Sequence, residues 1–214
     1  MKEKTLKELE TALGNHPGLE TCREDIKAAY GLLIDTVRSG GKIMTCGNGG
    51  SASDSGHIVG ELMKGFKSRR PLSQEQRDAL CRAFPYEGPA FADHLQQAIP
   101  AIALTDQTAI STAFANDVDP HMVFAQQVLG YGRAGDSLIG LSTSGNSGNV
   151  VNACKVAKAF GIKTIALTGE GGGILAGLCD VTVRVPAMET YRVQEYHLPV
   201  YHALCAMLEA ELYC

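Results

Sequence analysis

Several features that mark other classes of protein are missing from this chain of 214 residues. Its apolar runs are too short to cross a bilayer, which excludes a membrane-spanning segment. It has no long block of like charge and a formal net charge of −4, so nothing indicates a nucleic-acid-binding protein. Residues 1–10 are charged and helical in pattern, unlike a secretory signal.

The cysteines also lack a recognisable pattern. There are seven, an odd number, and none belongs to a CxxC pair. A scattered set of this kind is typical of reduced thiols and not of a disulfide framework. We therefore predict a cytoplasmic protein in which each cysteine is a small packing residue or an incidental surface thiol.

An apolar content of 45% is enough to build a substantial core, and we expect one domain over residues 1–214. Apolar residues at helical spacing predict two helices within residues 1–38, with a break at residues 14–18. Five short apolar runs then predict strands, at residues 42–46, 99–104, 137–141, 163–167 and 181–185. Helical patterns lie between most of these runs and after the last, at residues 52–66, 109–114, 122–129, 150–160 and 190–212. Strands that alternate with helices predict an α/β fold with a parallel sheet covered on both faces.

Residues 67–98 fit this alternation poorly. The segment is polar, and residues 73–76 resemble a capping box ahead of a helical pattern at residues 77–84. A second short helical stretch follows at residues 91–97. We interpret the segment as a helical insertion, either a lid over a site or a hairpin without a functional role.

The most informative stretch is the hydroxyl-rich segment at residues 141–150, which follows a predicted strand and leads into a predicted helix. Converging N–H and O–H donors at the positive end of a helix dipole favour an anion. The segment lacks the lysine of a Walker A loop and the spacing of a dinucleotide fingerprint, so a phosphorylated small molecule is a better prediction than a nucleotide. The alternative is an ordinary strand-to-helix turn with Ser147 as N-cap.

Two more loops follow predicted strands. The glycine-rich residues 46–51 either admit a ligand close to the backbone or form a tight turn, and residues 168–173 are interpreted as a flexible connection. Because the carboxyl ends of parallel strands share one edge of a sheet, we expect these loops to meet there, where such sheets bind ligands. Asn116 and Asp117 either bind sugar hydroxyls or close a turn.

Four polar side chains are candidates for the chemistry. His57 and Glu61 are four residues apart on a predicted helix, and Gln194 and His202 are eight apart on another, so each pair shares a helix face. Two imidazoles, a carboxylate and an amide oxygen suit a divalent metal such as zinc. Alternatively, Glu61 and His202 act as an acid–base pair in one proton transfer. Taken singly, each residue also has an ordinary role as a surface or core side chain.

Taken in order, these glycine, histidine–glutamate, hydroxyl and glutamine–histidine motifs resemble the SIS (sugar isomerase) domain and, more narrowly, the sedoheptulose-7-phosphate isomerase family. The resemblance covers nearly the whole chain. It implies a three-layer αβα, flavodoxin-like fold and a homotetramer with active sites built across subunit contacts. It also implies aldose–ketose isomerisation of sedoheptulose 7-phosphate to a heptose 7-phosphate, which leads toward the heptose of bacterial surface polysaccharides.

The same resemblance implies roles for residues at matching positions. Glu61 would remove the proton beside the carbonyl, and His202 would complete its transfer through an enediol(ate). The phosphate would be held by Ser142, Thr143, Ser144 and Ser147, and the sugar would be lined by Asn48, Gly49, Gly50, Ser51, Asn116, Asp117 and Gln194. One zinc per subunit is implied on His57, Glu61, Gln194 and His202, where it would polarise the carbonyl.

The chain departs from the family pattern at several positions. Tyr191 stands where the family has aspartate, Gly65 stands where an arginine is common, and Pro199 lies between Gln194 and His202. The insertion at residues 67–98 is longer than the usual connection. These changes leave Glu61 and His202 in place but alter the surroundings of the sugar. Another phosphosugar substrate is therefore an alternative, as is a non-catalytic SIS protein that binds a phosphosugar or a replication-initiator partner.

Overall fold

The computed structural model describes residues 1–214 and contains one sheet of five parallel strands. The strands are β1 (Ile43–Cys46), β2 (Ala101–Ala103), β3 (Ser137–Leu141), β4 (Lys163–Thr168) and β5 (Val181–Arg184). Their order, β2-β1-β3-β4-β5, is the flavodoxin-like one, in which the strand order reverses between β1 and β3. The predicted strands and their parallel arrangement are confirmed.

The strands are buried on both faces because their apolar residues alternate between two cores. Ile43 and Ile139, which lie on adjacent strands, belong to the larger core of 27 buried residues. Met44 pairs with Leu138, and both belong to the smaller core of 15 buried residues on the other face. This two-residue alternation is the pattern of a strand with an apolar layer on each side.

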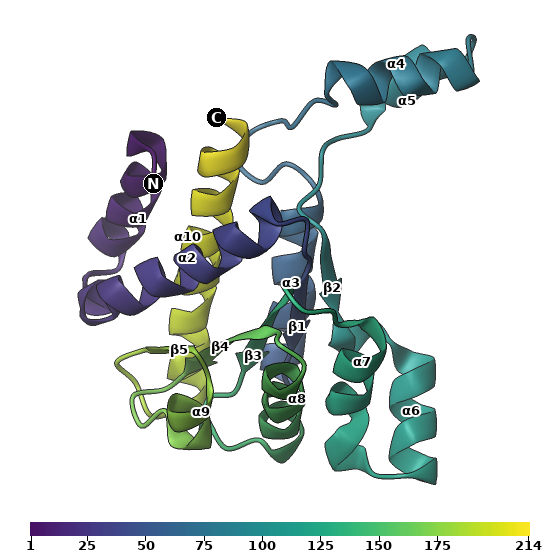
Figure 1. The fold of residues 1–214 in the computed structure, drawn as a ribbon. Helices are drawn as coiled ribbons and strands as arrows, with labels where there is room; N and C mark the ends of the chain where they lie inside the picture. The colour runs from purple at the N-terminus through teal and green to yellow at the C-terminus, as the bar shows by residue number, and fades with distance from the viewer.

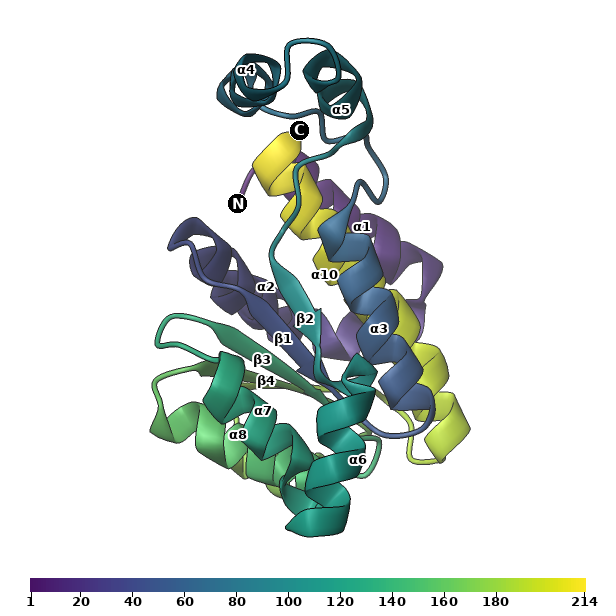
Figure 2. The same cartoon turned by 90° about the vertical axis from the view of Figure 1, so that its right-hand side faces the viewer.

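The helices form the two outer layers, as Figures 1 and 2 show. On one face lie α2 (Arg23–Arg38), α3 (Gly50–Met63) and α10 (Thr190–Tyr213), and α1 (Glu3–Asn15) packs on α10. On the other lie α7 (Val123–Tyr131) and α8 (Gly148–Ala159), with α6 (Thr108–Asp117) and α9 (Gly173–Leu178) beside them. Short 3-10 helices occur at Pro17–Cys22, Leu104–Asp106 and Pro120–Met122. The three-layer αβα architecture is thus confirmed.

The end of one helix and the presence of another differ from expectation. Helix α3 ends at Met63, because Lys64 is extended (φ −141°, ψ 174°), and not at residue 66. Helix α9 was not predicted: the connection at residues 168–173 leads directly into it through Gly172, whose φ of +70° is left-handed. A helix of six residues is too short to show a helical period in the sequence.

The insertion forms a helical hairpin of α4 (Gln74–Ala83) and α5 (Gly88–His94). The predicted capping box is present, since Ser73 Oγ accepts the N–H of Gln76 at 3.2 Å and Gln76 Oε1 accepts the N–H of Ser73 at 3.0 Å. The hairpin projects from the end of the molecule where α3 ends, opposite the loop where α3 begins (Figures 1 and 2). It therefore does not cover that loop in its own chain.

All seven cysteines are unpaired, and Cys22, Cys46, Cys154 and Cys205 are buried, as expected for packing residues. None of the helices combines the length and the apolarity that crossing a membrane requires.

Candidate active site

The loops after β1 and β3 meet at the point where the strand order reverses. They enclose a hollow of about 340 Å³ together with the start of α10. Ligands of doubly wound sheets bind at this position, because the two loops diverge there and leave a crevice. The lining residues are Asn48, Gly49, Gly50, Ser51, Leu141, Ser142, Thr143, Ser147, Thr190 and Gln194. Seven of the residues predicted to bind the sugar or its phosphate, together with Gln194, are thus brought together by the fold.

The hydroxyl groups of the β3 loop converge on one another. Ser142 Oγ lies 2.9 Å from Ser147 Oγ and accepts the N–H of Ser147 at 3.3 Å. Ser147 occupies the N-cap position of α8, but its side chain makes no capping bond. Ser147 is thus the N-cap residue, as the alternative interpretation has it, but its hydroxyl is not used for capping. Instead, two hydroxyls lie beside an N-terminus of α8 without a side-chain cap, an arrangement suited to an anion.

Glycines let the two sides of the hollow approach closely. Gly49 has φ +57° and ψ −124°, a conformation that other residues rarely adopt, and it precedes the first turn of α3. A Cβ on Gly50 would lie 2.6 Å from Gln194 Nε2, so the amide of Gln194 packs directly on the backbone at this position. The glycine-rich loop is thus a close-approach site and not only a turn.

Three predicted binding residues do not line this hollow. Ser144 is exposed, and its hydroxyl accepts the N–H of Asn146 at 3.2 Å within the same loop. Asn116 and Asp117 end α6, where Asn116 Nδ2 donates to Asp117 Oδ1 at 2.8 Å. In this chain, these three side chains satisfy one another or the nearby backbone.

The candidate proton-transfer residues meet where α3 runs alongside α10. His57 Nε2 lies 3.3 Å from Glu61 Oε1 and 3.4 Å from His202 Nε2. Lys64 Nζ lies 3.1 Å from the other carboxylate oxygen of Glu61. The predicted shared face of His57 and Glu61 is confirmed, and tertiary packing adds His202 to them.

The surroundings of this cluster suit proton transfer. The Glu61 side chain is 15% exposed, and His202 is half-buried against the Phe66 ring, 5.3 Å away between centroids. Burial lowers the pKa of His202, and the nearby His57 lowers it further. A neutral imidazole beside a carboxylate can accept a proton from one atom and return it to another.

Two residues of this cluster were not singled out from the sequence. The phenol of Tyr201 lies 2.9 Å from His57 Nδ1 and donates to Asp54 Oδ1 at 3.2 Å. Asp54 precedes His57 by three residues, so the spacing on α3 was a signal for it. Tyr201 gave no such signal, because it reaches His57 only through the packing of α10 on α3.

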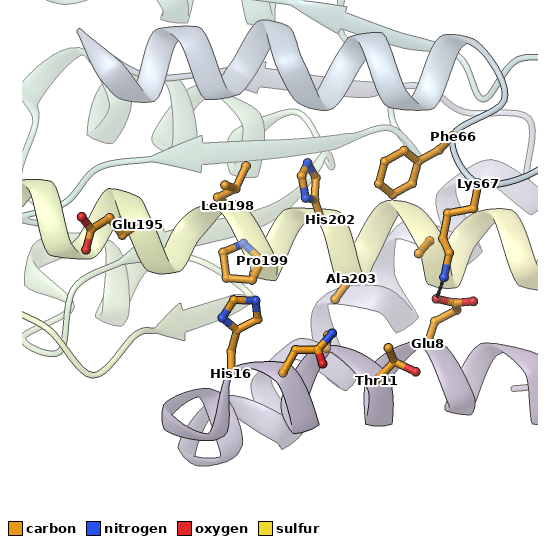
Figure 3. Close-up of a pocket in the computed structure, with 13 residues that line it drawn as sticks. Glu8, Thr11, His16, Phe66, Lys67, Glu195, Leu198, Pro199, His202 and Ala203 are labelled. Atoms are coloured by element: carbon orange, nitrogen blue, oxygen red, sulfur yellow. Dashed lines mark hydrogen bonds and ion pairs between the residues drawn. The ribbon is translucent and has the colours of Figure 1, made fainter.

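A second hollow, of about 270 Å³, lies beside His202 between α1 and α10. Figure 3 shows His202 pointing from α10 toward α3, with Phe66 next to it and His16 on the opposite side of α10. The apolar side of this second hollow is lined by Leu198, Pro199 and Ala203. At the edge of the hollow, Glu8 Oε2 pairs with Lys67 Nζ at 2.5 Å. Space for a ligand or for another subunit therefore adjoins His202.

The four predicted zinc ligands are not all brought together within this one chain. His57, Glu61 and His202 have the donor chemistry of a zinc site. However, no group of three or more His, Cys, Asp and Glu side chains is arranged to hold a metal ion. Gln194 packs on Gly50, and eight residues of helix, about 12 Å, separate it from His202. We therefore derive no catalytic step through a metal.

Comparison with known proteins places these features in a family. The sequence profile of the SIS domain family matches residues 16–76 and 79–169. The phosphoheptose isomerase of Akkermansia muciniphila is 39% identical over 199 residues, which is 93% of this chain and 92% of that protein. The solved phosphoheptose isomerase of Neisseria gonorrhoeae has a TM-score of 0.70 and 34% identity, and the comparison covers 94% of this chain and 93% of that one. That of Francisella tularensis has a TM-score of 0.71 and 30% identity, covering 86% and 85%.

Proposed function

Because this chain belongs to the phosphoheptose isomerases of the SIS-domain family, we propose that it interconverts sedoheptulose 7-phosphate and the corresponding aldoheptose 7-phosphate. The observation that carries this proposal is the cluster of Glu61, His57 and His202 on two packed helices. A carboxylate base and a neutral imidazole are the groups that enediol chemistry requires. The hydroxyl-lined hollow at the strand reversal supplies the phosphate site.

The reaction moves two protons and needs no external oxidant. Glu61 removes a proton from C1 of the ketose, and the electron pair forms the C1–C2 double bond of an enediol(ate). The same proton, or one from solvent, returns to C2. His202 moves a proton between the C1 and C2 oxygens, so that the carbonyl now lies at C1. The phosphate is unchanged and serves to hold the substrate.

A homotetramer with active sites across subunit contacts is part of the proposal. Gly50, in the phosphate hollow, and Glu61 lie eleven residues apart on α3, about 16 Å along the helix. The lining of the phosphate hollow includes none of His57, Glu61 and His202. A second subunit that brings its own phosphate loop to Glu61 would join the two halves. The hollow beside His202 offers room for such a contact.

Zinc remains a prediction outside this mechanism. If His57, Glu61 and His202 change rotamer, they can present three zinc-type donors, and a bound ion would polarise the carbonyl. Elemental analysis of the purified protein tests this. A cytoplasmic location is also proposed, because seven free thiols fit a reducing compartment.

Another phosphosugar is a second candidate substrate, and one contact favours it. Gly65 donates its N–H to Gln96 Oε1 at 3.0 Å, and a Cβ there would lie 2.7 Å from the same oxygen. The insertion therefore occupies the space beside a position where the family resemblance implies an arginine. Glycine in place of arginine at this position changes the charge and the shape near Glu61, and this alters which sugar phosphates the site can bind.

Deuterium exchange in heavy water tests the function directly. Five-, six- and seven-carbon sugar phosphates are incubated with the protein, and label at the carbon beside the carbonyl is measured. We expect label in sedoheptulose 7-phosphate above all. Label mainly in a different sugar phosphate would show that the substrate is the second candidate, another phosphosugar. If none of the sugars takes up label, the enzyme proposal is wrong and a binding protein is favoured.

A further inference from the structure

The phenol of Tyr201 joins two groups of α3, Asp54 and His57, that share no hydrogen bond with each other. Its hydroxyl donates to Asp54 Oδ1 at 3.2 Å and lies 2.9 Å from His57 Nδ1. The side chain is almost completely buried, with 1% of the residue exposed. Its ring packs edge-on against His57 and His202, with centroids 5.3 Å and 5.0 Å away. The packing therefore holds the hydroxyl in one position, where Asp54 and His57 are its hydrogen-bond partners.

The number of protons decides how these bonds run. A phenol has a single proton, and Tyr201 gives it to the Asp54 carboxylate, which can only accept. Toward His57 the phenol oxygen must then accept, so the proton of the neutral His57 ring lies on Nδ1. The lone pair of that ring is consequently on Nε2, the nitrogen that faces both Glu61 and His202.

We propose that Tyr201 is a positioning residue that, through its bond to Asp54, holds His57 in the Nδ1–H tautomer with Nε2 turned toward Glu61 and His202. The bonds then run in one direction, from His57 Nδ1–H to Tyr201 and from Tyr201 to Asp54. This role rests on the isomerase activity proposed above. It orients His57, the ring that lies beside both Glu61 and His202.

The position of Tyr201 makes this role specific. It directly precedes His202 on α10, so the same helical turn carries the acid–base residue and the group that orients its neighbour. Asp54 Oδ2 is buried without a partner, which leaves the bond from Tyr201 as the only hydrogen bond that the structure gives this carboxylate's side chain. Loss of a group that holds a catalytic histidine in its working tautomer lowers kcat, by up to about 10⁴-fold.

Tyr201→Phe is the direct test, because it removes the hydroxyl and keeps the ring packing. We expect kcat to fall about 10-fold or more, with KM changed less than about threefold. Tyr213→Phe is the matched control: it removes another phenol of α10, whose hydroxyl donates to Ala98 O at 3.3 Å, away from the cluster. The control is expected to retain wild-type kcat.

The tautomer gives a readout that does not depend on turnover. In protein labelled with ¹⁵N-histidine, the ring nitrogens of His57 are assigned by comparison with His57→Gln. We expect Nδ1 to carry the proton in the wild type. In Asp54→Ala the Tyr201 proton is free to turn to His57 Nδ1, so the ring proton should move to Nε2. In the Asp54→Ala, Tyr201→Phe double variant the loss in kcat should be no larger than in the more impaired single variant.

The outcomes separate this inference from the proposed function. An Nε2–H tautomer in the wild type, or a Tyr201→Phe variant with wild-type kcat and an unchanged tautomer, overturns the positioning role. A wild-type protein that exchanges no label with any sugar phosphate overturns the function, while the nitrogen spectra still decide whether Tyr201 sets the tautomer of His57.

Discussion

Arg70 and Glu209 form an ion pair, Nε to Oε1 at 2.8 Å, in which the Arg70 side chain is fully buried and that of Glu209 is 2% exposed. Arg70 also donates to the carbonyls of Leu62 at 2.7 Å and of Glu61 at 3.2 Å. The pair thus attaches the end of α3 to α10. The backbone that carries Glu61 is held in place by a buried charge that comes from the insertion's first residues.

Breaking this pair should be strongly destabilising. Arg70→Leu leaves Glu209 buried without its cation, and we expect a loss of about 3–5 kcal/mol in the free energy of unfolding. Urea denaturation measures it. Arg77→Leu is the control, because its pair with Asp93 is exposed and should contribute less than about 1 kcal/mol. Equal effects of the two variants would contradict the structural role of the buried pair.

Replacing the base should abolish isomerisation but not binding. Glu61→Gln keeps the shape of the side chain and removes the proton acceptor, so kcat should fall about 10²- to 10⁴-fold with little change in substrate affinity. Steady-state kinetics and deuterium uptake measure the first, and calorimetry the second. Glu24→Gln, in an exposed pair with Lys27, is the control. Normal turnover by Glu61→Gln would remove Glu61 from the mechanism.

Mixed tetramers test whether two subunits share a site. Ser147→Asp should prevent phosphate binding by charge repulsion, and an aspartate is well tolerated at an N-cap position. Each of Glu61→Gln and Ser147→Asp should be inactive alone. Co-assembled in equal amounts, they should recover about a quarter of wild-type activity if each site takes its base and its phosphate loop from different subunits. If each site lies within one subunit, the mixture stays inactive.

His197 should make stability depend on pH. It is fully buried, neither ring nitrogen has a hydrogen-bond partner, and burial lowers its pKa to about 4. Its unfolded pKa is near 6.5, so the unfolded state binds a proton first as the pH falls. The stabilising contribution of the neutral ring is complete above pH about 6.5 and is lost as the pH falls toward 4, by about 1–2 kcal/mol between pH 6.5 and 5.

His197→Phe removes this titrating group at similar volume, so its unfolding free energy should vary less between pH 6.5 and 5. Denaturation at a series of pH values measures the difference. The exposed His94, replaced by glutamine, serves as control and should keep the wild-type slope. An unchanged slope in His197→Phe would show that other groups cause the pH dependence.

Local patterns were sufficient to predict most of the fold. A strand buried on both faces appears in the sequence as a short apolar run. Leu138 and Ile139, for example, are adjacent in such a run although their side chains enter different cores. Helix α9 was missed because six residues contain less than two turns. The insertion was recognised by its composition, but its direction depends on contacts such as that of Gly65 with Gln96, which no local pattern reveals.

The sequence by itself determined the parallel sheet, the two loops at the strand reversal, and the shared face of His57 and Glu61, because each follows from spacing within a few residues. Only the tertiary structure brought Tyr201 to Asp54, 147 residues away, and placed His202 beside His57. It also placed the phosphate hollow and Glu61 at opposite ends of α3. Such distances depend on how α3 packs on α10, and that packing is set by the whole core and not by any one segment.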